Sequence, residues 1–258
     1  MLSRARRAAR VSALAGATLI AGVVLTGCGS ADADDATPEH RSFSISGREL
    51  TVDTDNSAIE LVPAAGDGKE VKVTRWFDGR VMAGSADVTW SMTDDDTLRL
   101  RMKCTGLSVD CEAKHRIEVP RGVAVTVKDD NGAVTARGLE TALRIRSSNG
   151  AIDVRDAKGA VELRSSNGQI TAKNLRSPKV KATTSNGEVR LGFDKAPDEV
   201  RTSTSNGATR ITLPRTPYKV DARSHNGQVS VDVPRDDAAP RLVSARSGNG
   251  AIEVRTTG

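Results

Sequence analysis

His40, His115 and His225 are the side chains best suited to acid–base catalysis or metal binding at neutral pH, and they lie in unrelated sequence contexts. No serine occupies the Gly-x-Ser-x-Gly pattern that exposes a catalytic nucleophile, and no serine-rich segment has a histidine and an aspartate nearby in a triad-like arrangement. The sequence therefore predicts no catalytic residue, no metal site and no cofactor, and we do not expect an enzyme.

Cys28 is the residue at which we expect covalent modification. The segment before it contains an apolar run from Val11 to Val24 and ends in Leu-Thr-Gly, and its arginines are Arg4, Arg6, Arg7 and Arg10. The run is too short and too rich in alanine and glycine for a membrane-spanning helix. It resembles a bacterial lipoprotein signal, which implies cleavage before Cys28, acylation of its sulfur and attachment to the extracytoplasmic face of the membrane. An ordinary secretory signal is the alternative, and Arg6-Arg7 leaves twin-arginine export open.

Cys104 and Cys111 are the other two cysteines. In an exported, oxidising setting such a pair is expected to close as a disulfide. Two free thiols are the alternative. A metal site would need more ligands than these two, and only His115 lies near them in the sequence.

The charge of the chain depends strongly on the signal segment. The whole chain has 38 basic and 33 acidic residues, and removal of residues 1–27 takes away four arginines, so 38 minus 4 leaves 34 basic residues. The mature chain is close to neutral, so its charge gives no support for nucleic-acid binding. Four arginines at matching outward positions could form a basic stripe, namely Arg146, Arg164, Arg223 and Arg246. Acids interspersed with them favour an ordinary mixed surface, namely Asp153, Glu162, Glu188 and Glu253.

Asn-Gly pairs divide the second half of the chain into repeats. Seven pairs follow one another at spacings of 18, 18, 19, 20, 20 and 23 residues by subtraction, and Asn56 occupies the same place in an earlier copy that has Ser57 instead of glycine. A period of about 20 residues with one or two short strands per unit is typical of a β-solenoid. We therefore predict an all-β, parallel β-helix-like solenoid of Ser-x-Asn-Gly repeats.

The asparagines are expected to stack. In most repeats an apolar pair, a hydroxyl and an asparagine alternate along one face, with Asp129 as the exception to the hydroxyl, and stacked coils about 4.8 Å apart would bring each side-chain amide over the next. The predicted structural ladder consists of Asn56, Asn131, Asn149, Asn167, Asn186, Asn206, Asn226 and Asn249. The rival interpretation is a type I′ hairpin turn at each Asn-Gly, which predicts an antiparallel sandwich. The recurring hydroxyl two residues before asparagine favours stacking.

The domain boundaries follow from composition. Residues 28–41 are small, acidic and without apolar periodicity, which predicts a disordered tether after the signal at 1–27. Residues 42–258 form one predicted domain, with a less regular, disulfide-stapled β section at 42–122 and regular repeats at 123–258. The final unit, Ser247 to Arg255, is predicted to be the open end of the stack, and open strand edges favour weak end-to-end self-association.

Several segments together resemble a family of bacterial surface proteins of unknown function described as candidate adhesins, common on actinobacterial lipoproteins. These are the lipobox, Val73 to Trp76, Arg116 to Gly122 and the Ser-Asn-Gly repeats. The resemblance implies a strand-repeat solenoid at the cell surface and carries no catalytic residues. We expect a non-enzymatic binding or structural module with an unknown extracellular protein or glycan ligand. A polysaccharide-acting β-helix enzyme and an accessory lipoprotein in envelope-stress signalling are the alternatives.

Overall fold

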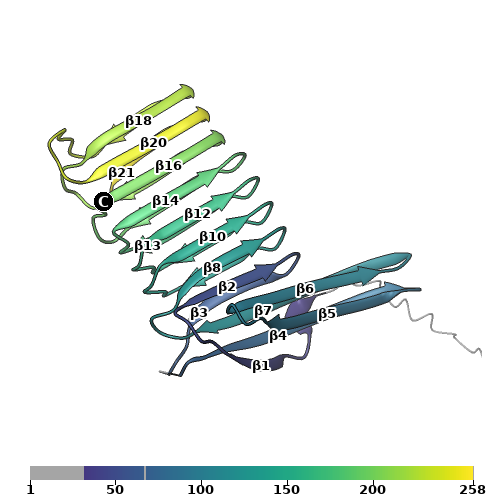
Figure 1. The fold of residues 1–258 in the computed structure, drawn as a ribbon. Helices are drawn as coiled ribbons and strands as arrows, with labels where there is room; N and C mark the ends of the chain where they lie inside the picture. The colour runs from purple at the N-terminus through teal and green to yellow at the C-terminus, as the bar shows by residue number, and fades with distance from the viewer. Residues whose placement is uncertain (1–31, 67, 258) are drawn as a thin grey trace, which may run out of the picture. The chain divides into compact units, whose positions relative to one another are not determined.

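The computed structural model describes residues 32–66 and 68–257, which fold into two β-sheets preceded by a short 3-10 turn, η1 (Ala33–Asp35) (Figure 1). The predicted signal at 1–27 and Cys28 lie outside the described residues. Among the described residues, no helix has the length and apolar character needed to cross a membrane.

The two longest strands, β4 (Glu70–Met82) and β7 (Ser108–Val119), belong to the irregular N-terminal section. Sheet A contains, in chain order, β1 (Glu39–Ser44), β3 (Ala58–Pro63), β4 (Glu70–Met82), β7 (Ser108–Val119), β9 (Val134–Arg137), β11 (Ile152–Arg155), β13 (Ile170–Leu175), β15 (Val189–Phe193), β17 (Thr209–Leu213), β19 (Val229–Asp232) and β21 (Ile252–Thr256). Sheet B contains β2 (Glu49–Thr54), β5 (Ser85–Met92), β6 (Thr97–Thr105), β8 (Ala124–Asp129), β10 (Leu143–Ser147), β12 (Val161–Ser165), β14 (Lys179–Thr184), β16 (Glu199–Asn206), β18 (Lys219–Asn226) and β20 (Leu242–Asn249).

Each repeat places its first strand in sheet B and its second in sheet A. The two strands of a repeat do not pair with each other; β12 pairs in parallel with β10 and β14, and β13 pairs in parallel with β11 and β15. Repeats therefore stack as coils, which confirms the predicted solenoid-like all-β fold, although the two sheets stay open rather than closing. The hairpin interpretation is wrong because the chain crosses from one sheet to the other at Asn-Gly.

The core lies between the two sheets and repeats with the coils. Inward side chains stack on their equivalents, so Leu143 registers with Val161 and Ile145 with Leu163. Sheet A contributes matching rows such as Ile152 on Ile170. Like-on-like stacking of aliphatic side chains fills the space without large rings, which is why the regular half buries only Phe193 and Tyr218 as aromatics.

The C-terminal coil does not lie at the end of the stack. β20 pairs with β16 on one side and β18 on the other, and β21 lies in the same way between β17 and β19. The chain therefore makes one coil, β18–β19, and then returns to insert the last coil beneath it. The prediction that Ser247 to Arg255 forms the open end is wrong, because the β18–β19 coil covers it. Figure 1 shows β20 between β16 and β18.

A similar reversal occurs near the start. The coil β2–β3 packs directly on β8–β9, although 75 residues separate Asn56 from Asn131. The less regular section lies on the other side of this coil, where β6 and β7 pair in parallel with β2 and β3, and β1, β4 and β5 add antiparallel strands. Sequence order and stacking order thus differ at both ends.

The described part of the predicted tether is ordered. Residues 33–35 form η1, and β1 starts at Glu39 and pairs with β4. The Ala33 side chain is buried, and its backbone N–H donates to Glu112 Oε2 at 3.2 Å. The prediction of disorder through Arg41 is therefore corrected for residues 32–41: small and acidic residues here dock on β4 and β7.

Candidate functional site

The turn between the two strands of a repeat explains the Ser-x-Asn-Gly pattern. The buried Ser165 hydroxyl accepts a hydrogen bond from the Gly168 N–H at 2.8 Å, three residues later, and so holds the turn closed. A Cβ at Gly168 would lie 1.9 Å from the carbonyl oxygen of Gly150 in the coil below. Only glycine permits this approach, and the same clash recurs at Gly187 against Gly168.

The asparagines form a continuous line of side-chain hydrogen bonds. Asn167 Nδ2 donates to Asn149 Oδ1 at 2.7 Å, and Asn186 Nδ2 donates to Asn167 Oδ1 at 2.9 Å. The line runs through all eight predicted positions and follows stacking order, so Asn249 donates to Asn206 and Asn226 donates to Asn249. The asparagines are exposed, however, whereas strand alternation predicts that they share the face of the buried apolar pair. The chain turns away from the core after the hydroxyl, which moves the amide to the surface.

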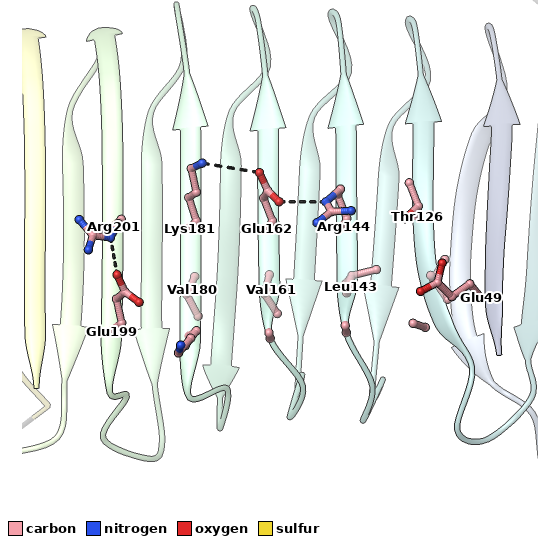
Figure 2. A pocket seen from close by; sticks show the side chains of 15 residues that line it. Glu49, Thr126, Leu143, Arg144, Val161, Glu162, Val180, Lys181, Glu199 and Arg201 are labelled. Carbon is pink, nitrogen blue, oxygen red and sulfur yellow. Dashed lines mark hydrogen bonds and ion pairs between the residues drawn. The ribbon is translucent and has the colours of Figure 1, made fainter.

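A groove runs across the outer face of sheet B and is here called the sheet-B groove. It has a volume of about 510 Å³ and crosses β8, β10, β12 and β14, with Glu49 and Glu199 at its two ends. Ala124, Ala142 and Ala160 are among the residues that line it, and they are stacked by backbone bonds from Val125 N–H to Ala142 and from Leu143 N–H to Ala160. The hollow arises because these small side chains lie next to a row of long charged side chains, which Figure 2 shows at Arg144, Glu162 and Lys181.

Paired charges form one wall of the sheet-B groove. Arg144 Nε donates to Glu162 Oε2 at 2.9 Å, and Lys181 Nζ lies 3.7 Å from Glu162 Oε1 (Figure 2). The hydrogen bond from Arg144 is the main reason why the pKa of Glu162 lies below its usual value. Glu199 forms an ion pair with Arg201. A carboxylate held ionised by arginine is a poor proton donor, so Glu162 is suited to binding a ligand rather than to acid catalysis.

The predicted arginine stripe is interrupted. Arg146 and Arg164 are register neighbours with Lys128 beside them, and Arg246 is a neighbour of Arg223, but Thr183 and Ser203 separate the two groups. Asp221 pairs with both Arg223 and Arg246. Of the four interspersed acids, Asp153 and Glu253 lie in sheet A and Glu188 directly precedes β15 of that sheet, so only Glu162 lies in sheet B with the arginines.

The histidines and cysteines lie apart from the sheet-B groove. His40 on β1 forms a side-chain hydrogen bond with Thr74 on β4, and His225 is exposed near the end of β18. Cys104 and Cys111 form a disulfide, as the sequence predicted. No cluster of three or more histidine, cysteine or acidic side chains suited to a metal occurs within residues 32–66 and 68–257.

A buried polar cluster was missed by the sequence interpretation. His115 is fully buried on β7, its ring lies 6.4 Å from that of Trp90, and burial with nearby Arg75 lowers its pKa to about 4. Arg75 lies over the Trp90 ring, 4.3 Å from its centroid, and bonds Glu39. A buried, neutral histidine of this kind contributes to core packing. No spacing in the sequence predicts that β4, β5 and β7 lie next to one another.

Comparison with known families decides the affiliation. The model of the family described as Toastrack DUF4097 matches residues 49–257. The chain belongs to this family. The match begins at β2 and covers every coil, so the in-register stack described above is this chain's version of the Toastrack fold.

One solved structure extends the likeness at the level of fold. A candidate adhesin from Bacteroides fragilis has a TM-score of 0.50 at 11% identity, with 86% of this chain and 97% of that chain covered. A candidate adhesin from Parabacteroides merdae has a TM-score of 0.44 at 12% identity, with 85% and 97% covered. Comparison with curated proteins found no match.

Proposed function

We propose that this Toastrack protein is a non-enzymatic, adhesin-like binding module at the cell surface. In this proposal an acyl group on Cys28 holds the protein at the extracytoplasmic face of the membrane, and an extended protein or glycan segment lies in the sheet-B groove. The observation that carries the proposal is the groove itself: its lining comes from successive coils, so its length matches an extended ligand rather than a small molecule.

The chemistry of the sheet-B groove supports a chain-like ligand with mixed polarity. Stacked alanines offer an apolar floor, and the Arg144–Glu162–Lys181 row offers both donors and acceptors. Insertions and side-chain changes in one coil of a solenoid alter one subsite without disturbing the others. The absence of aromatic side chains from the groove lining disfavours ring-stacking recognition of sugars, so we rank a protein segment ahead of a glycan.

The test uses a protein and glycan array probed with the soluble domain from Ala31 onward. The parent is compared with Ala142→Trp, which fills the groove floor on sheet B, and with Ala151→Trp, an exposed alanine that precedes β11 on sheet A. We expect the parent and Ala151→Trp to capture the same ligands in similar amounts. Ala142→Trp should capture at least tenfold less of each ligand than the parent does. Equal capture by all three would place the binding surface elsewhere.

The anchor is tested separately. Metabolic labelling with an alkyne-bearing fatty acid should label the parent and leave Cys28→Ala unlabelled, because the thiol is the predicted site of acylation. Equal labelling of both proteins, or of neither, would contradict the lipid anchor without touching the proposal for the sheet-B groove.

A further inference from the structure

Two residues with exposed apolar side chains are joined by a backbone hydrogen bond at the end of a long β arm. The arm consists of the outer halves of β4, β5, β6 and β7, and its tip is formed by the β4–β5 and β6–β7 turns. Met82 is 65% exposed and Leu107 is 86% exposed, and the Leu107 N–H donates to the Met82 carbonyl at 2.9 Å. Within the described part of the chain, Val229 at 38% is the one further large apolar side chain classed as exposed.

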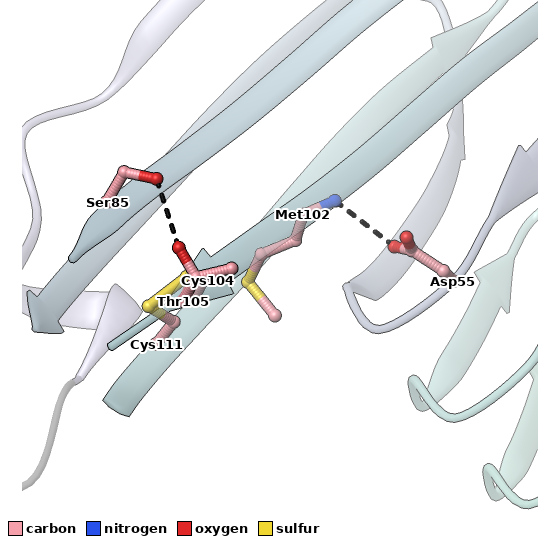
Figure 3. Close-up of a disulfide and its surroundings, with 6 residues drawn as sticks. All are labelled: Asp55, Ser85, Met102, Cys104, Thr105 and Cys111. Atoms are coloured by element: carbon pink, nitrogen blue, oxygen red, sulfur yellow. Dashed lines mark hydrogen bonds between the residues drawn. A yellow bond between two sulfur atoms is a disulfide. The ribbon is translucent and has the colours of Figure 1, made fainter. Parts of the chain in front are cut away.

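The arm that supports this tip has little core of its own and is braced by a disulfide. The fully buried positions of β6 and β7 end at Leu100 and Ala113, and beyond them the Cys104–Cys111 disulfide joins the two strands (Figure 3). At Gly84 an added Cβ would lie 1.7 Å from the Thr105 carbonyl oxygen, and at Gly79 it would lie 2.7 Å from the Ala86 Cβ, so the strands of the arm are closely packed. Adjacent apolar side chains exposed at the tip of a braced arm are costly to leave in water and are a feature of binding surfaces.

The start of the described chain runs along this arm toward its tip. β1 is antiparallel to β4, so residues before Glu39 run in the direction in which β4 approaches Met82. The Asp32 N–H donates to Asp78 Oδ2 at 3.2 Å, and Lys114 Nζ lies 2.6 Å from Asp34 Oδ1. Asp78 is four residues from Met82, and Cys28 is four residues from Asp32. Four residues span at most about 14 Å in either case.

We propose that Met82 and Leu107 dock into the surface of the bilayer that carries the acyl anchor. The inference rests on the proposed acylation of Cys28, which would keep the bilayer within reach of the arm. Around the tip, Arg80 registers with Asp110 and Asp87 with Lys103, so unlike charges face each other and docking is apolar rather than electrostatic. Burial of two such side chains favours the docked state on the order of a hundredfold. Because the acyl anchor already holds the protein at the bilayer, docking of the arm pays no further cost of association. The roughly hundredfold preference for the docked state is therefore enough to orient the molecule.

The experiment places a tryptophan at the tip of the full-length protein isolated from membranes. Leu107→Trp and, as the matched control at the far end of the stack, Val229→Trp are reconstituted in vesicles of phosphatidylethanolamine and phosphatidylglycerol with brominated acyl chains. The emission of the parent, which contains Trp76 and Trp90, is subtracted. We expect quenching of the added tryptophan in Leu107→Trp, at low and high salt alike, and none in Val229→Trp.

Each result is decisive because acylation is measured on the same samples by intact mass. An acylated Leu107→Trp protein that is not quenched overturns the docking inference and leaves the anchor intact. Quenching that disappears when Met82→Ser is added to Leu107→Trp supports the inference. A protein that lacks the acyl mass refutes the proposed anchor first. Self-association in sedimentation that is lost in Met82→Ser/Leu107→Ser, without quenching, would assign the tip to a second copy of the chain and overturn membrane docking.

Discussion

Ser165 and Ser166 are adjacent in the sequence and have opposite environments. Ser165 is buried and its hydroxyl accepts the Gly168 N–H, whereas Ser166 is exposed. We expect Ser165→Ala to lower the free energy of unfolding by about 1–3 kcal/mol, because it leaves a buried N–H without its partner, and Ser166→Ala to be nearly neutral. Urea titrations of the two variants measure the difference. Equal midpoints would mean that the hydroxyl does not hold the turn.

Asp129 occupies the position at which the other repeats have serine or threonine. Its Oδ1 accepts the Gly132 N–H at 3.1 Å and its Oδ2 accepts the Ser147 hydroxyl at 2.9 Å, and burial raises its pKa to about 6. Because the folded pKa is above the unfolded value of 3.8, Asp129 contributes stability below pH 3.8, and this contribution is lost as the pH rises through 6.

We therefore expect Asp129→Ser to stabilise the protein by about 1–3 kcal/mol at pH 7 and by progressively less as the pH falls toward 4. Urea titrations at several pH values, each compared with the parent, give this profile. A variant that is less stable than the parent at pH 7 would show that the ionised carboxylate is compensated by contacts that the serine cannot make.

At the scale of elements, the turn chemistry of the repeat could be predicted from the sequence, because hydroxyl, asparagine and glycine recur in fixed order. The exposure of Asn167 could not, since strand alternation assigns it to the buried face and the change of direction after Ser165 is a tertiary feature. The sheet-B groove could not be predicted from the sequence either. Its floor is made by alanines such as Ala142, which carry no pattern of their own until register places them side by side.

The disulfide belongs to the arm and should act locally. We expect Cys104→Ala/Cys111→Ala to lower the local stability of the arm by about 2–3 kcal/mol, because the arm has little core to replace the cross-link. Hydrogen exchange should speed up in the outer halves of β6 and β7 and stay unchanged in β10 and β12. Faster exchange throughout both sheets would mean that the arm and the coils unfold as one unit.

At the scale of the whole chain, the repeat number and the parallel stack follow from the Asn-Gly spacing, while the stacking order does not. The repeats of β16, β18 and β20 carry equivalent residues in register, so Asn206, Asn226 and Asn249 could stack in either order by local preference. The link from Val233 to Arg241 determines the stacking order. It forms backbone hydrogen bonds with Tyr218 and returns the chain beneath β18. Self-association through Glu253 and Arg255 loses its basis, because β21 is paired on both sides.

The central claim is that the coils form one in-register stack with the last coil inserted between two earlier ones, since the groove, the asparagine line and the open end all depend on it. Paired cysteines at outward positions test it in the soluble domain. Ser203 registers with Arg246, and Arg246 registers with Arg223, so Ser203 and Arg223 are two coils apart, at about 10 Å. Under mild oxidation, Ser203→Cys/Arg246→Cys should form a disulfide within one chain, and Ser203→Cys/Arg223→Cys should not. A disulfide in the second variant but not in the first would show that the coils stack in sequence order and would contradict this account.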